Sequence, residues 1–392
     1  MSRANITMLF IVLFLWSSCT KKEPLFIALD SEQTRIDFQN TVTNTTDLNI
    51  LNYLYFYNGA GVAAADFNND GLIDLYFTAN QTEDKLYINQ GNFIFKDVTA
   101  QSGIHNTGNW TTGVTTVDIN NDGLPDLYVC KVGSYDRIKG KNRLYINQGT
   151  QNGIPVFKED AHRYGLDIQA FSNQAVFFDY DLDADLDMFL LNHSVHPNSN
   201  YGNGNKREEI DTLSGDKLFE NKNGSFTDVS SEAGIFQGKT GYGLGVSVSD
   251  INNDGYPDIY VGNDFFENDY LYINQKNKTF KEIINTDQTR LGHTTHFSMG
   301  NAVNDLNNDG NMDIISLDML PEDLHTYKTS GLEYPYQTYA SYLKNGYAPQ
   351  YMQNTLHYNI DGENFSETAF LSGIAATEWS WNPLIADFDN DG

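Results

Sequence analysis

The sequence repeats one short loop that is rich in side-chain oxygens. Each loop carries Asp at positions 1, 5 and 9, Asp or Asn at position 3, and Gly or Ala at position 6. Five complete copies and the start of a sixth supply these residues: Asp66, Asn68, Asp70 and Asp74; Asp118, Asn120, Asp122 and Asp126; Asp179, Asp181, Asp183 and Asp187; Asp250, Asn252, Asp254 and Asp258; Asp305, Asn307, Asp309 and Asp313; and Asp387, Asp389 and Asp391. A single copy could be an ordinary turn, since Asn, Asp and Gly favour turns. Five copies with the same offsets indicate a metal-binding loop instead.

Calcium is the metal that this chemistry favours. Ca²⁺ takes six to eight hard oxygen ligands in a flexible shell, whereas Mg²⁺ requires stricter geometry and Zn²⁺ prefers nitrogen and sulfur. Gly at position 6 permits the sharp turn that such a loop needs. In the third copy Ala184 replaces that Gly and Asp185 adds a charge, so we expect its geometry to depart most. We predict several structural Ca²⁺ ions, each joining two strands by neutralising clustered carboxylates.

The residues around each loop predict short strands on both sides of it. The small and apolar runs before the loops are Gly61–Ala65, Gly113–Val117, Ala175–Phe178, Gly243–Ser249 and Met299–Asn304. The apolar runs after the loops are Leu75–Phe77, Leu127–Val129, Met188–Leu191, Ile259–Val261 and Ile314–Leu317. Two more strand-like runs follow in each unit, separated by Asn and Gly turns. Four strands in a repeat of roughly 50 to 80 residues predict an all-β fold, a β-propeller of four-stranded blades. An array of β-sandwiches is the less favoured alternative.

The repeats predict where the propeller domain lies. We expect it over residues 35–392, incomplete at the C-terminus, because five units and a start do not close a typical ring. The longer spacings between loops are interpreted as loop insertions at Val195–Asp216 and Asp318–Gln353.

The repeated loops resemble the FG-GAP/VCBS-type repeats of integrin α-chain propellers. The run Asn58–Asp66 that enters the first loop resembles the bacterial cartilage-acidic-protein-like (ASPIC/UnbV-associated) lipoproteins. The resemblance covers the chain from about Arg35 onward. It implies a seven-bladed or similar propeller, calcium in the blade loops, and a surface or extracellular location.

The N-terminus has the pattern of an export signal. Arg3 precedes an apolar run over Met8–Trp16, and the small residues Ser17 and Ser18 precede Cys19. The run is too short to span a bilayer. We predict a lipoprotein-type signal peptide over residues 1–18, lipidation of Cys19, and a tether over residues 19–34, with an ordinary signal peptide as the alternative. The protein is then an outer-membrane or cell-surface lipoprotein of a bacterium, or is secreted.

Charge and cysteine content narrow the possible partners. With 24 Lys and Arg against 52 Asp and Glu, the net charge is −28, which argues against nucleic acid and anionic membrane surfaces. A lipid anchor is therefore the expected membrane contact. Cys130 is the one cysteine after Cys19, so no intrachain disulfide is expected, and its apolar surroundings predict a buried structural thiol.

Catalytic motifs are absent from the sequence: no Gly-x-Ser-x-Gly, no phosphate loop and no His-Glu-x-x-His. We interpret the pairs His193/His196 and His293/His296 as surface or turn histidines. The Lys and Arg residues show no evident cluster. Residues after the second strand of each unit could line a site on one face or could equally cap turns: Asn80, Asn192, His193, Asn263, Asp264 and Asp318.

Three functions remain compatible with this sequence. The favoured one is a surface binding or scaffold module for glycan or protein ligands, with the aromatic loop at Tyr334, Tyr336 and Tyr339 as a candidate contact surface. The second is a carbohydrate-active enzyme such as a polysaccharide lyase, which would require His, Tyr, Arg or Lys side chains to converge in one funnel. The third is a purely structural part of a larger secreted protein.

Overall fold

Short antiparallel sheets make up most of the structure, a computed structural model that describes residues 24–106, 110–196, 204–287, 289–330 and 335–390. Five sheets have four strands each, and in each sheet the strands follow one another in chain order. Blade 1 comprises β1 (Val62–Ala65), β2 (Asp74–Phe77), β3 (Lys85–Asn89) and β4 (Phe95–Asp97). Blade 2 comprises β5 (Thr111–Val117), β6 (Asp126–Lys131), β7 (Arg143–Gln151) and β8 (Ile154–Glu159). Blade 3 comprises β9 (Ser172–Phe178), β10 (Asp187–Asn192), β11 (Lys217–Asn221) and β12 (Phe226–Asp228). Blade 4 comprises β13 (Gly243–Ser249), β14 (Asp258–Asn263), β15 (Tyr270–Asn274) and β16 (Phe280–Glu282). Blade 5 comprises β18 (Gly300–Asn304), β19 (Asp313–Leu317), β21 (Thr355–Asn359) and β22 (Phe365–Glu367).

The acidic loop occupies the same place in every blade. It joins the first strand to the second, so that the residue before the loop pairs with the Asp at loop position 9, as Ala65 pairs with Asp74. The same pairing closes the loops of the other blades, at Val117↔Asp126, Phe178↔Asp187, Ser249↔Asp258 and Asn304↔Asp313. The strands predicted from the flanks of the loops are confirmed.

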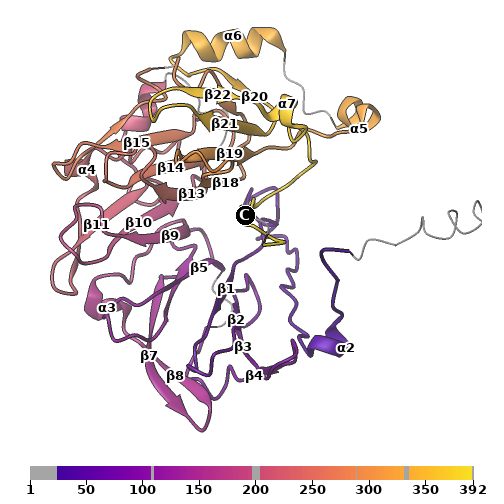
Figure 1. The fold of residues 1–392 in the computed structure, drawn as a ribbon, viewed down its shortest axis with the longest axis vertical. Coiled ribbons are helices and arrows are strands. Elements are labelled where there is room, and N and C mark those ends of the chain that lie inside the picture. The colour runs from indigo at the N-terminus through magenta and orange to yellow at the C-terminus, as the bar shows by residue number, and fades with distance from the viewer. Residues whose placement is uncertain (1–23, 107–109, 197–203, 288, 331–334, 391–392) are drawn as a thin grey trace, which may run out of the picture.

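The blades fan around a common centre (Figure 1), with their first strands innermost. These first strands are neighbours in sequence order: β1 lies beside β5, β5 beside β9, β9 beside β13, and β13 beside β18. This arrangement confirms the prediction of an all-β propeller of four-stranded blades.

Apolar side chains fill the spaces between consecutive blades. Between blades 2 and 3, for example, Tyr128, Cys130 and Leu144 pack in one cluster with Met188 and Leu190. The second strands β6, β10 and β14 are buried on both faces, which explains the nearly continuous apolar runs after their loops. Cys130 is fully buried, as predicted, and this burial raises the pKa of its thiol.

The segment before β1 packs against residues near the centre of the propeller. Tyr53, Tyr55 and Phe56 pack there with Trp110 of blade 2 and Phe171 of blade 3. Farther out, the same segment covers blade 1, where the ring of Phe38 stacks on Phe77 with 5.0 Å between centroids. The N-terminal segment therefore contributes to the core of the propeller.

Short helices connect the blades and occupy the insertions. The helices are α2 (Ser31–Thr34), α3 (Ala161–Tyr164), α4 (Ser230–Ala233), α5 (Leu324–Thr329), α6 (Tyr336–Lys344), α7 (Ala369–Ser372) and the 3₁₀ turn η2 (Gly204–Glu208). The second insertion also holds β20 (Gln350–Tyr351), which pairs in parallel with β17 (Thr294–Thr295). The two predicted insertions meet, since the amide of Gly204 donates to the carbonyl of Asn345 at 2.8 Å. They are partly helical and packed rather than simple loops.

Among the described residues, the helices are too short or too polar for any to cross a membrane. The predicted signal peptide over residues 1–18, Cys19 and the first part of the tether lie outside the described residues.

Candidate functional site

The acidic loops share one hydrogen-bonded backbone conformation. In the first loop Asp66 accepts from the amides of Asp70, at 3.0 Å, and of Gly71, at 2.7 Å, while Asp70 accepts from Leu72 at 2.9 Å. Equivalent bonds to the position-1 carboxylate recur in the other complete loops, at Asp118, Asp179, Asp250 and Asp305. These bonds wrap the loop around its acidic side chains and hold positions 1 and 5 on one side of the turn.

The third loop keeps this turn in spite of Ala184. Ala184 has φ 73°, in the left-handed region that Gly adopts at the other position-6 sites, such as Gly255 at φ 88°. A residue with a Cβ pays about 1 kcal/mol or more for that conformation. The backbone of the third loop nevertheless keeps the common turn, because the amides of Asp183 and Ala184 donate to Asp179 as in the other loops.

Position 9 differs from the other acidic positions because its carboxylate is buried and accepts hydrogen bonds from two backbone amides of its own blade. In blade 2, Asp126 accepts from the amide of Ile119 at 3.1 Å with one oxygen, and from that of Asn147 at 2.7 Å with the other. The equivalent residues Asp74, Asp187, Asp258 and Asp313 make the same two bonds. Burial raises the pKa to about 6 for Asp74 and Asp126 and to about 7 for Asp187 and Asp258. Position 9 thus has a structural role in addition to any ligand role.

Three carboxylates converge in the third loop. One oxygen each of Asp179, Asp181 and Asp187 lie within 4.8 Å of one another, the geometry of a cation site. The Asp181 side chain is only 3% exposed, and no backbone amide in the described part of the chain donates to it. Its charge is met instead by the ammonium of Lys278, which lies 2.5 Å from Asp181 Oδ2 and 2.6 Å from Glu220. The ammonium occupies a place that a metal cation could take.

A second recurring acceptor was missed in the sequence. In each blade, an Asp or Asn side chain just before the third strand accepts a hydrogen bond from a backbone amide at the end of the second strand or just after it. In blade 3, Asp216 accepts from the amide of Asn192 at 2.9 Å. Its counterparts are Asp84, Asn142, Asp269 and Asn354, at 2.7 to 2.8 Å. The signal was present, because each of these residues stands two positions before the Leu of its third strand.

Asn side chains at the end of the third strands tie neighbouring blades together. Asn147 of blade 2 donates to the carbonyl of Phe67 in blade 1 at 2.9 Å. Asn274 likewise reaches Tyr180 in blade 3, and Asn359 reaches Ile251 in blade 4, both at 2.8 Å. The first, third and fourth acidic loops are therefore bonded to the following blade at their position 2 carbonyls.

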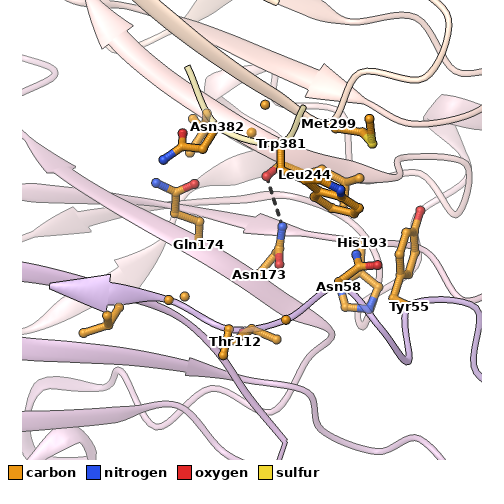
Figure 2. A pocket seen from close by; sticks show the side chains of 18 of the residues that line it. Tyr55, Asn58, Thr112, Asn173, Gln174, His193, Leu244, Met299, Trp381 and Asn382 are labelled. Carbon is orange, nitrogen blue, oxygen red and sulfur yellow. Dashed lines mark hydrogen bonds between the residues drawn. The ribbon is translucent and has the colours of Figure 1, made fainter. Parts of the chain in front are cut away.

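A pocket of about 320 Å³ lies where the first strands converge (Figure 2). At one corner Tyr53 Oη lies 3.1 Å from His193 Nε2, and the ring of Tyr55 meets His193 edge to face at 4.8 Å. His193 is 2% exposed, and burial lowers its pKa to about 3, so the imidazole is neutral. The interpretation of His193 as a surface or turn histidine is wrong, because the N-terminal segment covers it. His296, 1% exposed, is also buried.

The other residues predicted after the second strands are buried hydrogen-bonding groups. Asn80, Asn192 and Asn263 are at most 2% exposed, and Asn80 accepts from Asn40 at 2.8 Å. Burial raises the pKa of Asp264 to about 7 and that of Asp318 to about 6. Asp318 accepts from the amides of His296 and Phe297, at 2.9 and 3.1 Å. The turn-capping interpretation describes Asp318 and Asn80 best.

The predicted aromatic contact surface is not part of this pocket. Tyr336 and Tyr339 lie on helix α6, where Tyr336 is 76% exposed and Tyr339 stacks on Tyr351 with 5.7 Å between centroids. Tyr334 lies outside the described residues, as does Asp391 of the sixth acidic loop. Asp387 and Asp389 of that loop are exposed.

A basic cluster, not evident in the sequence, does exist. Lys131, Lys139, Lys141 and Arg143 line a second pocket of about 260 Å³ beside blade 2. Lys141 pairs there with Asp167 at 2.8 Å, and Arg143 with Glu159 at 3.6 Å.

Four-stranded blades around a centre, each with one acidic loop between its first two strands, define a β-propeller built from acidic-loop repeats. The sequence matches the family described as "FG-GAP-like repeat" over residues 66–129, 210–261 and 250–316. The chain therefore contains FG-GAP-like repeats over these residues, as the resemblance of its loops predicted.

Curated relatives are distant and longer than this chain. Cartilage acidic protein 1 of Mus musculus is 25% identical over 230 residues, covering 55% of this chain and 32% of the relative. The protein of the same name from Xenopus tropicalis is 24% identical over 210 residues, covering 52% of this chain and 28% of the relative. The chain thus spans about a third of the length of these relatives.

Solved structures are similar at a low level. They include a lectin of Agrocybe aegerita that recognises non-reducing terminal N-acetylglucosamine (TM-score 0.32, 14% identity, 78% of each chain covered). The rhamnogalacturonan lyase YesW has a TM-score of 0.33 at 12% identity, covering 66% of this chain and 46% of that one. The V. cholerae biofilm matrix protein Bap1 has a TM-score of 0.36 at 12% identity, covering 78% and 38%. These scores are too low to support an inference about function.

Proposed function

We propose that this protein is a calcium-stiffened binding or scaffold module that presents rigid loops to a glycan or protein ligand outside the cell. The observation that supports it best is the third loop, where one carboxylate oxygen each of Asp179, Asp181 and Asp187 lie within 4.8 Å of one another. Carboxylates this close repel one another when ionised, and a bound cation removes that repulsion. The other complete loops share its turn, which supports one ion in each.

Loop positions 1, 3 and 5 are the residues that would hold the ion. They supply carboxylate and amide oxygens, the ligands that calcium prefers. Position 9 would add an oxygen while its hydrogen bonds to the backbone keep the two strands in register. A bound ion would supply positive charge between like-charged side chains and so stabilise the blade.

Export and anchoring complete this proposal. The pattern around Cys19 supports a lipoprotein anchor at the outer membrane or cell surface, with secretion as the alternative. The large negative charge supports a role away from nucleic acid.

Thermal unfolding of the full chain with and without a chelator tests the calcium role. Ligand that binds only the folded state adds about 2.7 kcal/mol per site at 100 times its Kd, so chelation should lower the melting temperature markedly. Adding calcium back should restore it, and the same concentration of magnesium should restore it much less. An unchanged melting temperature in chelator would contradict the proposal.

The lyase alternative gains one observation, the convergence of Tyr53, Tyr55 and His193 in one pocket. It is tested by incubating the protein with acidic polysaccharides and measuring the unsaturated products. Product that disappears in Tyr53→Phe would favour an enzyme over a binding module. A purely structural role would be favoured if neither product nor glycan binding is found.

A further inference from the structure

The central pocket is built from the same register positions of every repeat. From each repeat, the walls of the pocket contain the two residues that stand six and five positions before the first Asp of the acidic loop. These pairs are Ala60 and Gly61, Thr112 and Gly113, Asn173 and Gln174, Leu244 and Gly245, Met299 and Gly300, and Trp381 and Asn382. The pocket is therefore the axial channel of the propeller, and the incomplete sixth repeat contributes to it as the five complete repeats do.

Glycine at the fifth position lets the inner strands approach closely in four of the repeats. A Cβ on Gly113 would collide with the carbonyl of Asn173, and a Cβ on Gly300 with the carbonyl of Trp381. Gln174 and Asn382 replace this glycine in the other two repeats. Figure 2 shows their side chains facing each other across the pocket. The ring of small residues around the pocket thus includes two amide side chains, those of Gln174 and Asn382.

Polar groups in this pocket are without protein partners. His193 Nδ1 and Asn301 Nδ2 are buried and make no hydrogen bond within the described part of the chain, and the residues are 2% and 8% exposed. An unpaired buried donor or acceptor costs about 1–3 kcal/mol, which a ligand that pairs with it would recover. The pocket therefore offers hydrogen bonds that the protein itself leaves unmade.

Aromatic rings and neutral amides make up the chemically active lining. Tyr53, Tyr55, Trp110 and Trp381 contribute rings, and Trp381 is 38% exposed. Amides donate and accept at one group, as sugar hydroxyls do, and aromatic rings present an apolar body to the C–H face of a sugar. His193 is neutral as well. A protein of net charge −28 repels anionic ligands, so this lining suits an uncharged one.

We propose that the axial pocket binds the end of a neutral glycan chain, with Gln174 and Asn382 hydrogen-bonding its hydroxyls and Trp381 packing on a sugar ring. The volume of about 320 Å³ is at the lower end of the range for ligand sites, which suits a terminal sugar residue rather than a long chain segment. This deepens the proposed binding role but does not depend on calcium in the loops.

Titration of the calcium-saturated full chain with short neutral hexose oligomers and with uronic-acid oligomers of equal length tests the proposal. Tryptophan fluorescence and calorimetry should both report binding of a neutral oligomer, with the uronic-acid series much weaker. Gln174→Ala and Trp381→Ala should each weaken binding on the order of tenfold, the effect of losing about one good contact.

Matched controls lie outside the pocket. Trp379→Ala removes an exposed Trp two residues away, and Gln275→Ala removes an exposed amide, and both should bind as the parent protein does. Equal binding by the pocket variants and the parent would overturn the proposal, as would preference for the uronic-acid oligomers or for peptides. If no neutral oligomer binds while calcium still raises the melting temperature, the glycan proposal fails and the calcium-stiffened scaffold stands.

Discussion

At the scale of single residues, the acidic loop contains two kinds of carboxylate with different physical roles. Asp126 is fully buried and satisfies two backbone amides, whereas Asp122 is exposed and accepts from Leu124 and Asn120 within its own loop. A buried acceptor is expensive to remove because it leaves its donors unpaired. An exposed carboxylate matters chiefly when an ion is bound to it.

These roles predict that two substitutions in one loop differ in how far their effect on stability depends on calcium. Asp126→Ala should lower the free energy of unfolding by about 2–4 kcal/mol with or without calcium, because two buried amides lose their acceptor. Asp122→Ala should be nearly neutral in chelator and destabilising only when calcium is present. Denaturant unfolding under both conditions measures this difference. If Asp122→Ala costs the same in chelator as in calcium, the exposed positions are not ligands.

At the scale of the blade, the third strand contributes both to its own sheet and to the contact with the neighbouring blade. In blades 2, 4 and 5 the third strand pairs inside its own sheet and, through the Asn at its end, also bonds to the preceding blade. Blade 1 provides a natural comparison, because Asn89 donates to Ile73 of its own blade at 3.0 Å, whereas Asn147 donates to Phe67 of the neighbouring blade. The two Asn residues occupy the same place in the repeat, so they isolate the contact between blades.

Asn147→Ala should therefore destabilise two blades, and Asn89→Ala only one. We expect Asn147→Ala to cost about 1–3 kcal/mol, since its amide is buried. Hydrogen exchange should become faster in both β1–β2 and β6–β7. In Asn89→Ala the faster exchange should stay within β2–β3. Equal local effects of the two substitutions would show that the bond between blades contributes little.

At the scale of the whole molecule, buried acids in the segments between the second and third strands of blades 3 and 4 couple stability to pH. Burial raises the pKa of Asp216 to about 8 and that of Asp264, Glu267 and Asp269 to about 7. A carboxyl whose pKa is higher in the folded state binds its proton more tightly there. Its stabilising contribution is therefore present at low pH and is lost as the pH rises through the folded pKa.

The free energy of unfolding should accordingly fall as the pH rises from about 5 to about 9 at constant calcium. Asp216→Asn should flatten this slope, because Asn can accept the same amide bond without a charge, as Asn142 and Asn354 do in blades 2 and 5. Urea unfolding across that range measures the slope. Asp228→Asn is the control, since hydrogen bonds from Ser230 and the charge of Lys217 outweigh burial and lower the pKa of Asp228. Replacing Asp228 should leave the slope between about pH 5 and 9 unchanged, because a carboxyl whose pKa is lowered is ionised in both the folded and the unfolded state over that range.

The sequence by itself determined the repeat, the strands and the acidic loops. Each of these follows from local chemistry: position-specific Asp and Gly dictate a turn, and apolar runs dictate strands buried on both faces. The tertiary structure alone decided what depends on contacts between distant segments. The burial of His193 follows from the N-terminal segment that covers it, and the ion pair between Asp181 of blade 3 and Lys278 of blade 4 follows from the packing of those two blades. The axial pocket follows from the placement of all the first strands around one centre, a long-range arrangement that no single repeat encodes.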